Sequence, residues 1–179
     1  MILRHRNLYR LTVCALFSAC LCVLSPIAIP IGPIPISLGL LGVLLCAATL
    51  PPKMSFSSVA VFIALGICGL PVFSSGNSGA MVLAGPTGGY LWSYLLAAPL
   101  ISCLISKQRG SVLKNTASCS LGVLLCYLCG TIQYTLLTNT APLAALLITV
   151  LPFLPFDLLK AVLAAYISQI IKKHKIIKD

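Results

Sequence analysis

The stretch that decides the fold is LPFLPFDLLKAVLAAYISQII, residues 151–171. It is long enough to cross a bilayer as a helix, which takes about 20 mostly apolar residues. Only two of its side chains are charged, Asp157 and Lys160. Four lysines follow it directly, Lys172, Lys173, Lys175 and Lys178. An apolar run that ends in a basic cluster is typical of a membrane-spanning helix whose end lies in the cytoplasm.

The rest of the chain is apolar in the same way. Of the 179 residues, 59% are hydrophobic and 8% are charged, and the mean hydropathy is +1.08. A soluble domain carries about 25% charged residues, and a disordered chain has low hydrophobicity, so both classes are excluded. Long unbroken apolar runs also disfavour a transmembrane β-barrel, whose strands alternate polar and apolar residues.

Apolar runs separated by prolines, glycines or basic residues predict an all-α membrane protein of six transmembrane helices. We expect one integral membrane domain, residues 1–179, with no room for an ATPase domain. The expected spans are residues 8–29, 36–50, 56–70, 88–105, 116–137 and 152–171. The short apolar run at 141–150 is a candidate re-entrant or surface helix. Alternatively, the first run is a signal peptide, because Phe17-Ser18-Ala19-Cys20 approaches a lipoprotein cleavage box.

Basic residues alternate between the connections of these spans. All of the 12 lysines and arginines except Lys160 fall in the N-terminus, the second and fourth connections, or the C-terminus. They are Arg4, Arg6, Arg10, Lys53, Lys107, Arg109, Lys114, Lys172, Lys173, Lys175 and Lys178. By the positive-inside rule, both termini lie in the cytoplasm and the protein sits in the cytoplasmic membrane. The net charge of +10 therefore reflects membrane orientation and not nucleic-acid binding.

Asp157 and Lys160 break this pattern because they lie inside the last span. Their spacing of three residues places both on one helical face. An ionisable residue within a membrane segment is costly and marks a functional site; the alternative is a mutually neutralised pair that holds the bundle together. Since the span begins at the uncharged outer side, we expect the pair to face an outer cavity. A carboxylate accepts and an ammonium donates hydrogen bonds, which suits a small ligand with both kinds of group.

The segment 71–89 is rich in Gly, Ser and Asn and lies on the same outer side. It is too polar for a lipid-facing helix, so protein or a cavity must surround it. Its end, Gly85-Pro86-Thr87-Gly88-Gly89-Tyr90, permits close approach of the backbone to a ligand. The alternative is a helix N-terminal turn capped by Thr87. No Gly-Lys-Ser/Thr follows, so it is not a phosphate-binding P-loop.

Other motifs point to packing. Cys126-x-x-Cys129 lies in an apolar run without a second pair or a neighbouring His, which favours core packing over a metal or redox site. No catalytic residue set, metal site or cofactor site is predicted. Ala15-x-x-x-Ala19 permits close approach of two membrane helices, either within the chain or with a partner.

Four groups of residues carry a family resemblance. They are Ile34-Pro35-Ile36-Ser37-Leu38, Gly69-Leu70-Pro71-Val72-Phe73, Gly85–Tyr90, and Leu151-Pro152-Phe153 with Asp157-x-x-Lys160. With these motifs the sequence resembles the BioY family, the biotin-binding S components of energy-coupling factor (ECF) transporters. The likeness extends from about Leu8 to Ile171.

The resemblance implies an ECF S-component-like bundle with an outward-facing pocket that binds biotin with high affinity. It implies three partner chains, a transmembrane coupling protein and two ATPases, and a subunit that reorients in the membrane when ATP is hydrolysed. Many relatives carry an asparagine shortly after Pro-Val-Phe, which falls on Ser75, with Asn77 two residues later. The implied ligand-binding residues are Asp157, Lys160, Tyr90, Thr87, Gly85, Ser75 and Asn77, and the implied partner interface is Ala15 and Ala19.

Two other classes of function compete with biotin uptake. One is an S component of the same architecture for riboflavin or thiamin, which the ligand motifs disfavour. The other is a small membrane channel or enzyme subunit. An enzyme needs acid/base or nucleophile sets, and a channel needs polar residues repeated around a pore; the sequence offers neither.

Overall fold

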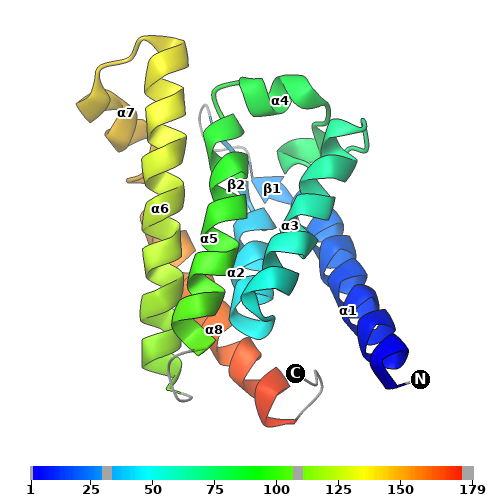
Figure 1. The fold of residues 1–179 in the computed structure, drawn as a ribbon. Helices are drawn as coiled ribbons and strands as arrows, with labels where there is room; N and C mark the ends of the chain where they lie inside the picture. Colours follow the sequence, from blue (N-terminus) through cyan, green and yellow to red (C-terminus); the bar gives the residue numbers. More distant parts are fainter. Residues whose placement is uncertain (1, 30–33, 107–110, 175–179) are drawn as a thin grey trace.

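Helices make up most of the described part of the chain, which comprises residues 2–29, 34–106 and 111–174 of the computed structural model (Figure 1). An apolar helix pairs its backbone polar groups internally, as a lipid environment requires. The helices are α1 (Ile2–Leu24), α2 (Gly39–Thr49), α3 (Pro52–Ile67), α4 (Ala80–Ala84), α5 (Gly88–Ser106), α6 (Val112–Thr138), α7 (Pro142–Thr149) and α8 (Leu154–Lys173), with a 3₁₀ turn, η1 (Ser74–Gly76).

A short hairpin separates α1 from α2. Strand β1 (Ala28–Ile29) pairs antiparallel with β2 (Ile36–Ser37), Ala28 lying opposite Ser37. The predicted all-α fold therefore contains one small β element. Helix α1 begins six residues before the predicted span 8–29 and ends five residues before its end, and α2 begins three residues after the start of the predicted span 36–50. Prolines stop helix formation between the two helices; Pro30 and Pro33 of that stretch lie outside the described residues.

The later helices begin and end within four residues of the predicted spans. The short run at 141–150 forms α7, and the segment 71–89 holds η1 and α4. By length and composition, four helices of the described ranges, α1, α5, α6 and α8, can cross a membrane, whereas α2 and α3 are shorter apolar helices.

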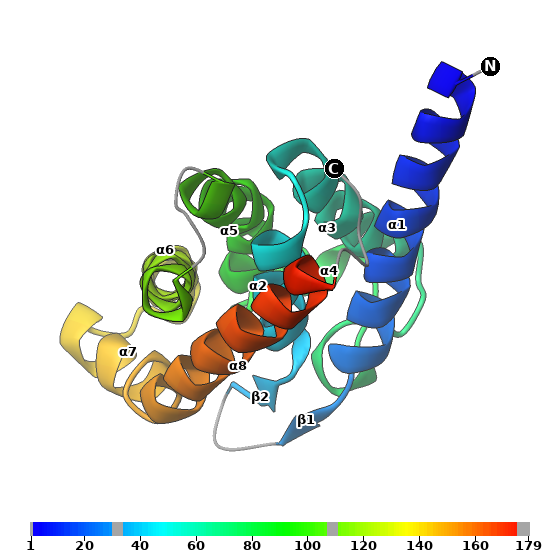
Figure 2. The ribbon, with the colours of Figure 1, turned by 90° about the horizontal axis from the view of Figure 1, so that it is seen from below.

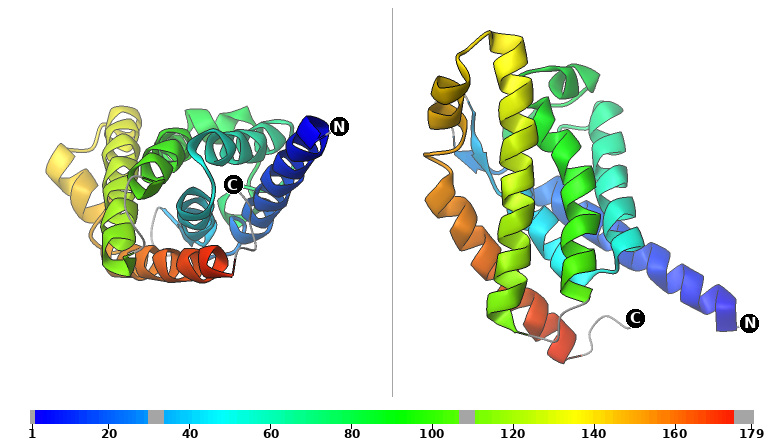
Figure 3. Two further views of the ribbon diagram at one scale, coloured as in Figure 1. Left: turned by 60° about the horizontal axis from the view of Figure 1, so that its bottom comes forward. Right: turned by 60° about the vertical axis from the view of Figure 1, so that its left-hand side comes forward.

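Helix α2 lies inside a ring formed by the other long helices (Figures 2 and 3). It packs on α8 and α5, and α5 packs along α6 and α3. The core follows this arrangement: Val43 and Leu44 of α2 are fully buried, and the rings of Phe62 and Phe73 meet edge to face at 5.7 Å. Helix α1 lies at the edge against α3, where Ser18 Oγ donates to Ser58 O at 2.8 Å.

Four of the described basic residues lie at one end of the bundle. The α2–α3 turn, the start of α6 and the end of α8 lie together at the bottom of Figure 1, and they carry Lys53, Lys114, Lys172 and Lys173. We call this the basic end. The side chains of Arg4, Arg6, Lys107, Arg109, Lys175 and Lys178 lie outside the description.

Candidate functional site

A cavity of about 230 Å³ lies between the hairpin, η1, α2, α5, α6 and α8. It is several times larger than the roughly 30 Å³ that one water occupies in the liquid, so it has room for a small molecule. Its apolar walls include Ile34, Ile36, Leu40, Phe73 and Phe153. Its polar lining includes Ser37, Ser74, Asn77, Thr87, Tyr90, Tyr94, Tyr127, Asp157 and Lys160.

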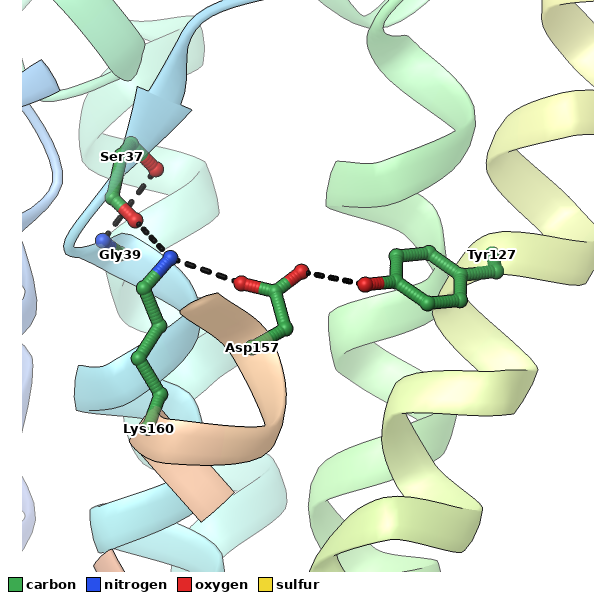
Figure 4. Close-up of polar contacts among 5 residues, drawn as sticks. All are labelled: Ser37, Gly39, Tyr127, Asp157 and Lys160. Atoms are coloured by element: carbon green, nitrogen blue, oxygen red, sulfur yellow. Dashed lines mark hydrogen bonds and ion pairs between the residues drawn. The ribbon is translucent and has the colours of Figure 1, made fainter. Parts of the chain in front are cut away.

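A buried ion pair lies at this cavity (Figure 4). Asp157 is in the first turn of α8, where the helix dipole favours a negative charge, and Lys160 follows three residues later on the same face. The ammonium Nζ lies 2.8 Å from Asp157 Oδ1. The two residues are only 4% and 7% exposed, so the predicted pair is formed and buried.

Two further groups form hydrogen bonds with the charged pair. Lys160 Nζ donates to the backbone oxygen of Ser37 at 2.8 Å, and the Tyr127 hydroxyl donates to Asp157 Oδ2 at 2.8 Å. A buried charge is tolerated only when it is paired and hydrogen-bonded. These contacts join α8 to β2 and to α6 (Figure 4).

The Asp157–Lys160 pair can form further hydrogen bonds with a ligand. Lysine has three N–H donors and a carboxylate has about four acceptor positions. The hydrogen bonds above use two donors of Lys160 and two positions of Asp157. Among the residues that the structure describes, this leaves one N–H and two acceptor positions for other partners. The two predictions for this pair are therefore compatible, since it connects the bundle and also presents polar groups at the cavity.

A second polar group comes from η1. Ser74 Oγ is buried and has no hydrogen-bond partner in the described part of the chain, which calls for a ligand or water there. Asn77 lines the cavity, and its Nδ2 donates to Ser74 O at 2.8 Å. Ser75 has a left-handed φ of 60°, is exposed, and is not among the described lining residues. The structure therefore brings Asn77, and not Ser75, to the cavity.

The Gly85–Tyr90 motif contributes Thr87 and Tyr90 to the lining but not Gly85. The Gly85 oxygen accepts a hydrogen bond from Gln133 Nε2 at 2.8 Å. A Cβ added at Gly89 would lie 2.5 Å from the backbone oxygen of Cys129 on α6. This glycine therefore permits α5 to begin close against α6, which favours the helix-start interpretation over backbone approach to a ligand.

Several lining residues were not predicted from the sequence. Tyr127 and Ser74 belong to no sequence motif. A tyrosine within the apolar run 116–137 is only a weak signal, because a buried tyrosine hydroxyl usually has a hydrogen-bond partner. Cys126, predicted as core packing, is buried and also lines the cavity. Within the described ranges, no three His, Cys, Asp or Glu side chains come together to hold a metal ion.

Comparison with known proteins identifies the family. A family model described as the BioY family matches residues 3–176. The chain belongs to the BioY family. The resemblance predicted from the motifs is thereby confirmed.

The BioY relatives cover nearly the whole chain. The biotin transporter BioY2 of Lactococcus lactis is 36% identical over 161 residues, which is 90% of this chain and 88% of the relative. The biotin transporter BioY of Thermotoga maritima is 36% identical over 161 residues, 90% of this chain and 94% of the relative. A crystal structure of the S-component for biotin from an ECF-type ABC transporter matches with a TM-score of 0.88 at 31% identity, covering 94% of this chain and 93% of that one.

The partner residues that the BioY resemblance implies lie on α1. Ala15 and Ala19 are both exposed on this helix. This exposure favours a partner surface over internal packing. Their role toward a partner stays a prediction.

Proposed function

We propose that this chain takes up biotin as the substrate-binding S component of an ECF-type ABC transporter, and is not itself an enzyme. The observation that carries the proposal is the buried Asp157–Lys160 pair at a largely apolar cavity, in a chain of the BioY family. The relatives named as biotin transporters and the biotin S-component structure support it.

The chemistry of the cavity suits biotin, which has an apolar bicycle, a ureido group and a carboxylate. Asp157 accepts a ureido N–H, and the remaining N–H of Lys160 donates to a ligand oxygen. The bicycle packs against Phe73 and Phe153, and the Ser74 hydroxyl, which has no partner in the described ranges, supplies a further polar contact. An apolar cavity with a few polar anchors is typical of small-molecule sites.

The proposed topology has six spans in one integral domain, residues 1–179, with both termini in the cytoplasm. At 1.5 Å per residue, the 11 residues of α2 are about 16 Å long, roughly half of the hydrocarbon core. The hairpin would complete this span, and irregular backbone is tolerated at membrane depth when protein surrounds it. The grouping of lysines at the basic end supports the orientation.

The proposed partners are a transmembrane coupling protein and two ATPases, with α1 as the docking helix. The exposed Ala15 and Ala19 let a partner helix approach closely. The variant Ala15→Leu/Ala19→Leu should lose capture of the coupling protein and keep biotin binding. Ala117→Leu, at an exposed alanine of α6, is the matched control and should keep both; equal capture by all three proteins would contradict the proposed interface.

The test of the substrate is binding of radiolabelled biotin to the purified chain in detergent. We expect saturable binding that unlabelled biotin displaces and that riboflavin and thiamin do not. Absence of biotin binding by folded protein would refute the proposal. Displacement by riboflavin or thiamin would assign the cavity to another vitamin.

A further inference from the structure

A second cavity, of about 610 Å³, lies at the basic end. The end of α5, the start of α6 and the last turns of α8 surround it. Asp157 and Lys172 are 15 residues apart on α8, which corresponds to about 22 Å along the helix. This cavity is therefore separate from the proposed biotin site. Its lining includes Ile105, Asn115, Tyr166, Ile170, Lys172 and Lys173.

Asn115 gives this cavity an unsatisfied acceptor. The residue is only 2% exposed, and its Oδ1 atom is buried without a hydrogen-bond partner among the described residues. A buried polar atom normally has a partner, because leaving it unpaired costs free energy. A carbonyl oxygen can only accept, so a partner that fills the cavity must bring a hydroxyl or an N–H.

The charge of the cavity favours an anion. Lys172 and Lys173 are exposed at its rim, and the residues described in its lining include no acid. Lysine ammonium groups bind phosphate as point charges. The first turn of α6, in which Asn115 lies, also directs the positive end of a long helix dipole to this region.

The walls of the cavity favour a lipid. Ile170 and Tyr166 are exposed on α8, and tyrosines are enriched where a membrane meets water. Basic pockets between transmembrane helices at the cytoplasmic side bind anionic lipid headgroups. A soluble phosphate ester would use the lysines and Asn115 but would gain nothing from these apolar walls.

We propose that this cavity binds the headgroup of an anionic phospholipid that carries a hydroxyl, of the phosphatidylglycerol type. The phosphate lies at Lys172 and Lys173, the headgroup hydroxyl donates to Asn115 Oδ1, and the acyl chains run along Ile170 and Tyr166. Soluble glycerol phosphate also carries a phosphate ester and a hydroxyl. The test must therefore distinguish a bound phospholipid from this soluble ester.

Native mass spectrometry of the purified chain with added lipids measures this binding. Wild-type protein should retain phosphatidylglycerol several-fold better than phosphatidylmethanol, which is anionic but lacks a headgroup hydroxyl, and better still than phosphatidylcholine. Asn115→Leu should bind the two anionic lipids equally. Equal binding of both by the wild type would overturn the role of Asn115.

The lysines are tested with a matched pair of double variants. Lys172→Gln/Lys173→Gln should lower phosphatidylglycerol binding about tenfold or more, because it removes both ammonium groups that the proposal places on the phosphate. Lys53→Gln/Lys114→Gln removes the same charge from the basic end at exposed residues outside the cavity, and should change binding less than twofold. Equal losses in the two double variants would show general attraction to charge and overturn the site.

The source of the phosphate is tested by competition. Millimolar glycerol phosphate should leave the bound lipid in place; displacement would assign the cavity to a soluble ester and overturn the lipid proposal. Thermal unfolding and biotin binding of each variant serve as folding readouts. Loss of lipid selectivity in a variant with unchanged unfolding supports the site whether or not biotin is the substrate of the first cavity.

Discussion

Replacing Asp157 alone should destabilise the protein, whereas replacing it together with Lys160 should leave the stability close to that of the wild type. The variant Asp157→Leu leaves the Lys160 ammonium buried without its carboxylate, which costs about 3–5 kcal/mol. For a chain of this length each kcal/mol corresponds to about 2–4 °C, so the unfolding midpoint should fall by about 6–20 °C. The variant Asp157→Leu/Lys160→Met removes both charges and their desolvation penalty.

The double variant should therefore stay close to the wild type in stability. Tyr127 and Ser37 each lose one hydrogen bond to the pair, at about 0.5–1.5 kcal/mol each, and the absent desolvation penalty offsets this loss. We expect a change of no more than about 2 kcal/mol in the free energy of unfolding. Biotin binding should nevertheless fail. Hydrogen bonds to charged groups contribute about 1.5–3 kcal/mol each, so losing two lowers affinity at least about 100-fold.

Thermal unfolding in detergent and equilibrium binding of radiolabelled biotin measure the two effects on the same preparations. Lys53→Met, at an exposed lysine, is the control and should change stability by no more than about 0.5 kcal/mol. A double variant that binds biotin like the wild type would refute the ligand role and leave the pair a purely structural one. A single variant as stable as the wild type would refute the burial argument.

Three smaller predictions test the surroundings of the cavity. Tyr127→Phe removes the hydroxyl that donates to the buried carboxylate and should lower stability by about 1.5–3 kcal/mol in thermal unfolding; Tyr134→Phe, on the same helix but outside the described lining, should have a smaller effect. Ser74→Ala removes a hydroxyl that has no hydrogen-bond partner among the described residues, so it should leave the unfolding midpoint of the ligand-free protein unchanged and weaken biotin binding about 2- to 12-fold; unchanged affinity would exclude a ligand contact. Gly130→Ala places a Cβ 2.3 Å from the Tyr90 ring and should cost about 1–3 kcal/mol; a raised midpoint, as helix propensity alone predicts, would show that α5 and α6 have room there.

Local signals predicted much of the fold. Spans α5, α6 and α8 follow from apolar length and from the prolines, glycines and lysines that bound it, all of which are near in sequence. The hairpin was not predicted, because strands of two residues have no periodic pattern. It depends on pairing Ala28 with Ser37 across a proline-rich stretch, which is a contact between separate segments.

The candidate site likewise combines residues that a local motif predicts with residues that only the packing of the bundle brings together. The Asp157–Lys160 pair was predicted because its spacing of three residues is a local helical relation. Its other partners lie 30 residues away, at Tyr127, and 123 residues away, at Ser37. Such contacts follow from the packing of the bundle and not from a motif. The glycines before Tyr90 left two interpretations open for the same reason, since their role depends on which helix lies against them.

A structure determined with biotin bound tests the central claim most directly. The account predicts one biotin in the cavity between α2, α5, α6 and α8, with a ureido nitrogen within hydrogen-bond distance of an Asp157 carboxylate oxygen and a ligand oxygen near Lys160 Nζ. Biotin bound elsewhere on the chain, or bound in this cavity with neither residue in contact, would contradict it.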